Sequence, residues 1–180
     1  MRPIYNLELL IRALPHIVNT FPHITVIIVG KGKGKSKLEL LAKKLGVYES
    51  IQFMAPVIYT KMPSLFKKAD IFVSPSRSDG LCVALLESIA CGAFPIVSNI
   101  PGNRELIHDG INGYLFPINN PMKLAKAVIN TIENPQIIKN AMEKNTKMIQ
   151  ERYTESRQIK ETEDFFYHII NKRKLWQKEF

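Results

Sequence analysis

Two carboxylates that could bind a polar ligand, Asp79 and Glu87, stand eight residues apart around a glycine and an apolar run. A helix is predicted to begin at Gly80, and at 100° per residue it places Glu87 on a face opposite Leu85 and Ile89. The residues that share this face are small or of moderate size: Val83, Ala84, Ala90 and Cys91. A charged group in so apolar a helix is unfavourable unless a polar partner meets it. The small neighbours leave room for that partner to be a ligand.

The backbone between the two carboxylates offers hydrogen-bond donors to an anion. Unpaired N–H groups and about half a positive charge at a helix N-terminus suit a diphosphate. Here these donors are the amides of Gly80, Leu81, Cys82 and Val83. Glu87 is placed to accept two hydrogen bonds from a ribose diol, and Asp79 to hold the hydroxyls of a sugar. Spacing alone leaves a plainer alternative open, in which Glu87 pairs with a lysine and Asp79 caps the helix.

Short apolar runs alternate with amphipathic stretches along the chain, which predicts an α/β fold. Strands are predicted at residues 25–29, 50–53, 71–73, 94–98 and 114–116. Helices are predicted at 7–21, 36–45, 63–69, after Gly80, and at 122–133, 136–151 and 155–174. Asn6 is expected to cap the first of these helices. The alternation favours a doubly wound, Rossmann-like parallel sheet that binds ligands at the carboxyl ends of its strands.

The glycine-rich loop after the first strand resembles a phosphate loop without matching one. Gly30 to Gly34 leaves three residues where a Walker A motif has four, and Lys35 stands where the dinucleotide fingerprint needs glycine. A tight turn with exposed lysines is therefore favoured over an anion site. The four histidines are scattered without the spacing of metal ligands, so no metal site is predicted.

The charge of the chain is concentrated in one region. Of the net charge of +9, residues 31–68 contribute nine lysines against two glutamates. A solvated lysine-rich surface is the favoured interpretation, with a phosphate-bearing ligand or an anionic membrane surface as alternatives. Nucleic acid is disfavoured because stacking aromatics are not interleaved with the lysines.

Other features of the composition indicate a cytoplasmic protein, with the inner face of a membrane as a further site of association. No apolar run approaches the roughly 18–20 residues of a membrane span, and the first residues lack the apolar segment of a signal peptide. Cys82 and Cys91 lie out of phase in one predicted helix and are not expected to form a disulfide.

Several stretches together resemble one family. The segment 74–87, followed by residues 90–97, is similar to the nucleotide-sugar-binding half of retaining GT-B glycosyltransferases of group 1. The Glu-x7-Glu motif of that family corresponds here to Asp79-x7-Glu87. Further similar stretches follow the family's order over about residues 5–150: Ile28-Val29-Gly30-Lys31-Gly32, Gln52-Phe53, Ala69-Asp70-Ile71-Phe72-Val73, Gly102-Asn103-Arg104-Glu105 and Asp109-Gly110-Ile111-Asn112-Gly113.

The resemblance implies roles for the residues already singled out. Glu87 would bind the nucleotide ribose, Asp79 the donor sugar, and the amides after Gly80 the diphosphate of a UDP- or GDP-sugar. The loops at Gly30 and Val57 would face the phosphates or the base. Residues 1–152 would form the donor-binding domain, and residues 153–180 a helix and basic tail that cross to an amino-terminal acceptor domain or subunit. No cofactor is expected and no catalytic residue is assigned.

The sequence also departs from the family, and three functions remain open. Tyr5-Asn6 stands where the family has a lysine of its diphosphate clamp, Arg2 is out of register for the clamp's arginine, and the strand expected before the first helix is missing. The favoured function is a donor domain for sugar transfer to a hydroxyl with retention, as a fragment or as half of a split enzyme. The alternatives are a non-catalytic nucleotide-binding or subunit-interaction domain and, less favoured, a dinucleotide-binding oxidoreductase.

Overall fold

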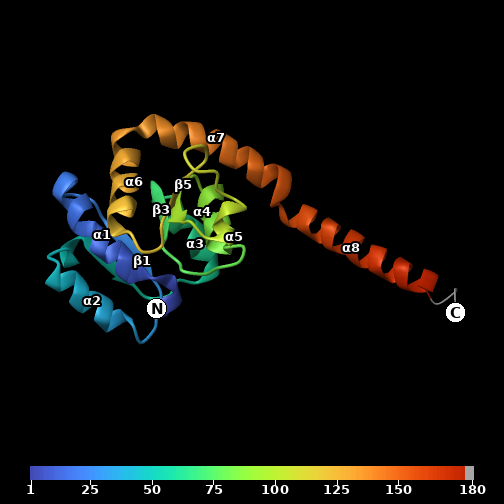
Figure 1. Cartoon of the computed structure of the whole chain (residues 1–180), viewed down its shortest axis with the longest axis horizontal. Helices are drawn as coiled ribbons and strands as arrows, with labels where there is room; N and C mark the ends of the chain where they lie inside the picture. The colour runs from blue at the N-terminus through green and yellow to red at the C-terminus, as the bar shows by residue number, and fades with distance from the viewer. Residues whose placement is uncertain (177–180) are drawn as a thin grey trace.

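The strands of the computed structural model, which describes residues 1–176, form two parallel sheets (Figure 1). β1 (Val26–Val29) pairs with β2 (Ile51–Met54). The second sheet has the order β3-β4-β5, comprising β3 (Ile71–Ser74), β4 (Phe94–Ser98) and β5 (Tyr114–Phe116). Every pairing is parallel, so each connection must cross over, and helices supply most of the crossovers. The predicted α/β class is confirmed, with strands close to their predicted positions.

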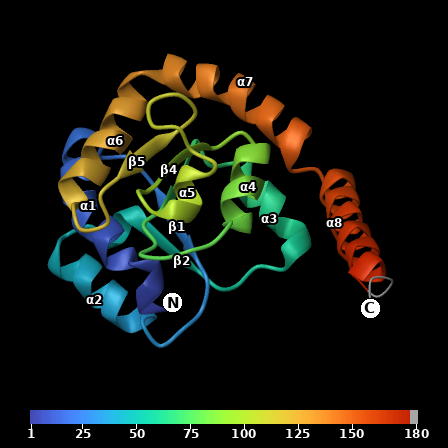
Figure 2. The same cartoon turned by 45° about the vertical axis from the view of Figure 1, so that its right-hand side comes forward.

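Helices cover both faces of these sheets (Figure 2). One face carries α1 (Leu7–Thr20), α2 (Lys35–Lys44) and α6 (Pro121–Glu133), and the other carries α4 (Val83–Ala90). α3 (Met62–Phe66) packs against α4, and α5 (Pro101–Arg104) follows the carboxyl end of β4. α7 (Pro135–Arg152) runs from one face to the other, because Ala141 packs with the first group and Met148 with the second. Three single turns complete the fold: η1 (Pro3–Tyr5), η2 (Tyr48–Ser50) and η3 (Tyr59–Lys61).

β4 shows why both faces must be covered, because all five of its residues are buried. Phe94 and Ile96 lie in the core that includes α1, α2 and α6, whereas Val97 packs with Leu85 and Ile89 of α4. Alternate residues of a strand point to opposite faces, so one continuous apolar run serves two cores. The β3-β4-β5 sheet is therefore covered by helices on both sides, as a doubly wound fold predicts.

Asn6 precedes α1, but the prediction that its side chain caps the helix is wrong. Asn6 has a left-handed backbone (φ 51°) and its side chain makes no capping bond. Its amide donates to the Ile118 carbonyl (3.0 Å) and its Oδ1 accepts from the Arg77 guanidinium (3.1 Å). Tertiary partners in two other loops have replaced the local helical one, which sequence spacing could not reveal.

α8 (Glu155–Trp176) projects away from the rest of the molecule (Figure 1). Its residues are exposed from Glu155 to Ile169, including Phe165 and Phe166. The predicted helix is present, while the end of the predicted basic tail, residues 177–180, lies outside the described residues. Within residues 1–176, no helix combines the length and the apolar character that crossing a bilayer requires.

Candidate functional site

The predicted site lies in the loop that joins the carboxyl end of β3 to α4. Asp79 and Gly80 are exposed in this loop, and Glu87 is half-buried in the second turn of α4. Leu85 and Ile89 face the core, and Val83 is 61% exposed on the side that Glu87 shares. The predicted faces of this helix are therefore present, and the two carboxylates flank its first turn from the loop and from the helix.

The helix itself begins later than predicted. Cys82 is the N-cap in an extended conformation, and its carbonyl accepts from the amides of Leu85 (3.0 Å) and Leu86 (3.2 Å). Gly80 and Leu81 therefore precede the helix instead of forming its first turn, which corrects the predicted set of donors. The amides that open α4 are those of Val83 and its successor Ala84.

The Cys82 thiol lies over the opening turn of α4. Burial raises the pKa of this thiol, and the charge and hydrogen bonding of Asp79 raise it further, whereas the amides of Leu85 and Ala84 lower it. The raising effects prevail, so the thiol stays protonated at neutral pH. Cys82 and Cys91 are both free thiols, as predicted.

Glu87 faces an aromatic residue that the sequence did not single out. A hydrogen bond to Glu87 and the negative charge of that carboxylate raise the pKa of the Tyr59 hydroxyl. Tyr59 opens η3, in the loop that also holds half-buried Val57, and the residue is 74% exposed. Its position just beyond the carboxyl end of β2 was the one available signal. Among residues 1–169, whose side chains are described, Glu87 has no salt bridge with a lysine, and Asp79 does not cap α4, so the contacts of the plainer alternative are not formed there.

A buried polar network supports the base of the site loop. The Ser98 hydroxyl, at the end of β4, donates to the Ser76 carbonyl (2.5 Å). The Asn103 amide, in α5, donates to the Ser98 carbonyl (2.8 Å) and to the Ser98 hydroxyl (3.3 Å). All three residues are at most 3% exposed. Buried polar groups that are fully paired fix a unique geometry, so this network sets where residues 76–80 leave the sheet.

Gly102 supports the tip of the same loop by having no side chain. A Cβ at Gly102 would lie 2.4 Å from the Gly80 carbonyl oxygen and 2.7 Å from that of Asp79. A Cβ at Gly80, by contrast, would meet nothing within 4 Å. The loop therefore rests with its backbone on α5 and leaves open space above Gly80.

Arg77 ties this loop to two others, and sequence reasoning missed it. Its guanidinium donates to the side-chain oxygens of Asn6 and of Asn119, each at 3.1 Å, and its amide donates to the Ile4 carbonyl (2.9 Å). Because these partners are distant in sequence, no local pattern marks the residue. The loop after β3 is thereby fastened to the start of α1 and to the loop after β5.

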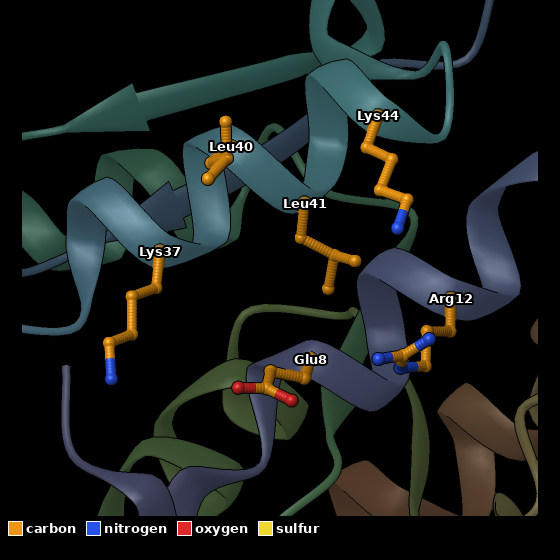
Figure 3. Close-up of a pocket in the computed structure, with 6 residues that line it drawn as sticks. All are labelled: Glu8, Arg12, Lys37, Leu40, Leu41 and Lys44. Carbon is orange, nitrogen blue, oxygen red and sulfur yellow. The ribbon is translucent and has the colours of Figure 1, made fainter.

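The remaining predicted loops follow the other sheet. Gly30 (φ 141°) directly follows β1, and Val57 follows β2. The lysines of the loop 31–35 are exposed or half-buried, in keeping with the favoured solvated surface. A separate hollow lies between α1 and α2, lined by long side chains that are exposed except for half-buried Leu41 (Figure 3). It is away from the β3–α4 loop, and we place the candidate site at that loop because parallel α/β sheets bind ligands at strand carboxyl ends.

Residues 1–153 match the sequence profile of the family described as glycosyl transferases group 1. The chain belongs to this family. An uncharacterised glycosyltransferase of Methanocaldococcus jannaschii is 31% identical over 151 residues, which cover 82% of this chain and 38% of that protein. A D-inositol 3-phosphate glycosyltransferase of Streptomyces bingchenggensis is 28% identical, over 77% of this chain and 32% of its own length. This group 1 chain thus spans well under half the length of these relatives.

Solved structures share the fold of this group 1 glycosyltransferase chain. The Anabaena protein HepE, solved in complex with UDP-glucose, superimposes with a TM-score of 0.82 at 22% identity, over 91% of this chain and 46% of HepE. The carboxy-terminal domain of the group 1 protein LpcC from Francisella tularensis superimposes with a TM-score of 0.78 at 21% identity. That match covers 86% of this chain and 83% of the LpcC domain, so this chain has the size of one such domain.

Proposed function

We propose that this group 1 glycosyltransferase chain binds a nucleotide diphosphate sugar at the β3–α4 loop. The observation that carries the proposal is the placement of Asp79 and Glu87 on either side of the open first turn of α4, with empty space above Gly80. Solved complexes of the similar HepE fold with UDP and with UDP-glucose support a nucleotide-sugar ligand. The sugar would pass to a hydroxyl acceptor with retention at the anomeric carbon.

Each group at the site would act on a different part of the donor. Glu87 would accept hydrogen bonds from the ribose hydroxyls, and Asp79 would hold the hydroxyls of the sugar. The Val83 and Ala84 amides would bind the diphosphate and stabilise its charge as it leaves. Gly30 and Val57 would border the phosphates or the base. A partner domain or subunit on the amino-terminal side would bind the acceptor, in keeping with the greater length of the relatives.

Calorimetry with UDP, GDP and their glucose and mannose derivatives tests the donor site. We expect one of these ligands to bind, and Glu87→Gln to weaken its binding at least about tenfold, because a charge-assisted pair of hydrogen bonds is lost. Glu143→Gln, an exposed position on α7, is the matched control and should leave the affinity unchanged. Failure of all these nucleotides to bind, or equal affinity in both variants, contradicts the proposal.

A second function, nucleotide binding without transfer, is favoured by one observation. The Asn6 side chain, at the place where the family has a clamp lysine, is occupied by the Ile118 carbonyl and by Arg77. Transfer is tested by adding an acceptor-binding domain from a group 1 relative and following release of the nucleoside diphosphate. Binding that persists without sugar transfer to any acceptor would leave the second function standing.

We further infer that the protein works in the cytoplasm against the inner face of a membrane. This inference is based on the lysines that are exposed within residues 31–68. Co-sedimentation should then occur with vesicles that contain anionic lipid and not with neutral vesicles, and should decline with salt. Equal recovery with both kinds of vesicle contradicts this placement.

A further inference from the structure

The hollow between α1 and α2 lies outside the candidate site and is lined mainly by charged side chains (Figure 3). Its volume is about 240 Å³, somewhat below the roughly 300 Å³ at which pockets for drug-sized ligands begin. Glu8 and Arg12 line it from α1, and Lys37, Leu41 and Lys44 line it from α2. The hollow therefore has the size and the polarity to take a small charged molecule.

The three cations of the hollow have no partner among residues 1–169, the part of the chain whose side chains are described. Arg12, Lys37 and Lys44 form no salt bridge and no side-chain hydrogen bond there. The other two lysines of α2 do have partners. Lys35 forms a salt bridge within the helix (3.6 Å), and the Lys43 amino group lies 4.9 Å from the centroid of an aromatic ring. The lysines without a partner are thus the ones that line the hollow.

Two of the cations face one another across the hollow. The Lys44 side chain points from α2 toward Arg12 on α1, and the Leu41 side chain lies between the two helices (Figure 3). Leu41 also packs against the core, so it gives the hollow an apolar floor. A recess with cations around a low-dielectric floor focuses the positive potential and raises the local concentration of anions.

Lys37 and Glu8 complete the charge of the hollow. Lys37 stands seven residues before Lys44, about 10.5 Å along the helix axis, which two flexible lysine side chains can bridge around one anion. Glu8, one turn before Arg12, points toward the Lys37 end (Figure 3). Its carboxylate lies in the first turn of α1, where negative charge is favourable. Three cations against one carboxylate leave an excess of two positive charges.

A phosphate monoester matches this excess, because a phosphorylated hydroxyl carries about −1.5 to −2 charge at pH 7 and has three strong acceptor oxygens. We infer that the hollow between α1 and α2 binds a phosphate monoester whose carbon skeleton carries a hydroxyl group. Arg12 donates to two phosphate oxygens as a fork, and Lys44 supplies a compact charge from the opposite helix. Glu8 accepts from the hydroxyl group, and the carbon skeleton lies on Leu41.

This ligand is separate from the donor sugar nucleotide. α1 and α2 cover the face of the fold opposite to α4, so the hollow and the β3–α4 loop are filled independently. The same phosphate chemistry occurs in free esters and in lipid headgroups. Glycerol 3-phosphate and lysophosphatidic acid represent these two sources, because they share one headgroup and differ in the acyl chain.

NMR titration of the 180-residue chain with glycerol 3-phosphate tests the free ester. The Leu41 methyl signals report occupancy of the hollow itself, since Leu41 lines it. We expect saturable shifts, and Arg12→Gln/Lys44→Gln should weaken binding at least about tenfold, because charge-assisted hydrogen bonds are lost. Lys67→Gln/Lys68→Gln, which removes two charges from exposed positions outside the hollow, is the matched control and should keep the affinity. Equal weakening in both double variants overturns the inference.

Co-sedimentation with phosphatidylcholine vesicles that contain lysophosphatidic acid tests the lipid headgroup. Capture that is lost in Arg12→Gln/Lys44→Gln and kept in the control assigns the hollow to a lipid. Shifts with glycerol 3-phosphate and no such capture assign it to a free ester. Binding in neither experiment overturns the inference.

The carboxylate of the hollow provides a test of opposite sign. Glu8→Gln should tighten the binding of inorganic phosphate at least about threefold, again followed at Leu41, because the negative charge that repels the anion is removed. Glu143→Gln, on exposed α7 surface, is the matched control and should leave the affinity unchanged. Equal or weaker phosphate binding in Glu8→Gln overturns the inference.

Discussion

At the candidate site, a contact with one carboxylate changes the pKa of a neighbouring hydroxyl. Glu87 lies in α4, and its carboxylate accepts a hydrogen bond from the Tyr59 hydroxyl, which belongs to the loop after β2. The hydrogen bond and the negative charge both favour the protonated phenol. Glu87 and Tyr59, from two different elements, are therefore neighbours at the candidate site.

Removing the Glu87 charge should therefore lower the pKa of Tyr59 back toward its ordinary value. We expect Glu87→Gln to shift the titration of the Tyr59 hydroxyl to lower pH, because the negative charge that disfavours the phenolate is removed. The measurement is an NMR titration of protein labelled at the tyrosine Cζ carbon, with Glu143→Gln as the control. An unchanged Tyr59 titration in Glu87→Gln would show that the two side chains are not in contact in solution.

The Cys82 thiol supplies a second prediction, for reactivity. Burial and the Asp79 carboxylate raise the pKa of this thiol, so its alkylation at pH 8 should be slow and should accelerate as the pH rises. Asp79→Asn removes an opposing charge, lowers the thiol pKa and should speed alkylation at pH 8. Peptide mapping after iodoacetamide treatment measures the rate, and Cys91 in the same digest is the internal reference. A slower reaction in Asp79→Asn would contradict the contact.

At the scale of elements, the site loop packs on β4 and α5. Ser98 and Asn103 fix its base, and the bare backbone of Gly102 carries its tip. These supports come from β4 and α5, the two elements that follow the site helix in the chain. The geometry of residues 76–80 is thus set by residues some 20 positions further on.

Two glycine substitutions distinguish a position that contacts the site loop from a position that borders open space. Gly102→Ala should lower the free energy of unfolding by about 1–3 kcal/mol, because its Cβ would overlap the Gly80 carbonyl oxygen. Gly80→Ala, the matched control, has room for its methyl group and should change stability by less than about 0.5 kcal/mol. Urea denaturation followed by circular dichroism measures both. Equal stability of the two variants would show that the loop does not rest on α5.

The elements were predictable where a periodic apolar pattern spans them, and less so where tertiary contacts decide. β4 and β5 have the predicted bounds because their apolar runs are short and flanked by turn residues. The start of α4 was misplaced because nothing in Gly80-Leu81-Cys82 signals that Cys82, an unusual cap, ends the loop. Tyr59 and Arg77 were missed because their partners lie far away in sequence. The Asp79–Glu87 pair was found because its spacing is local.

At the scale of the whole molecule, α7 marks the boundary between packed and unpacked chain. The buried Asn112 and Asn145 amides bond reciprocally, with Asn112 donating to Asn145 Oδ1 (3.0 Å) and Asn145 donating to the Asn112 carbonyl (2.9 Å). This pair pins α7 to the turn before β5. Beyond Tyr153, the exposed residues of α8 have an i,i+4 pair, Arg157–Glu161 (2.7 Å), which contributes at most about 0.5 kcal/mol.

Limited proteolysis should therefore remove α8 first. Trypsin is expected to cut at Arg157 and Lys160 while sites in α7 resist, because α8 opens at little cost and α7 is anchored. Mass spectrometry of a time course identifies the cuts. Asn145→Ala, which breaks the reciprocal pair, should lower stability by about 1–3 kcal/mol and admit cleavage at Lys144 and Lys147. Cleavage within α7 of the unaltered chain before α8 is lost would contradict this order.

The guanidinium of Arg77 has a consequence for how substitutions combine. Because one cation bonds to Asn6 and to Asn119, the loops after β3 and β5 and the start of α1 share a single charged donor. Changes at these three residues should then be non-additive in double-mutant cycles, since the first change removes the contact that the second would have broken. Which substitutions are tolerated at Asn119, far from the donor-binding motif, would therefore depend on the residue at position 6. These positions would evolve as a correlated group although neither asparagine belongs to that motif.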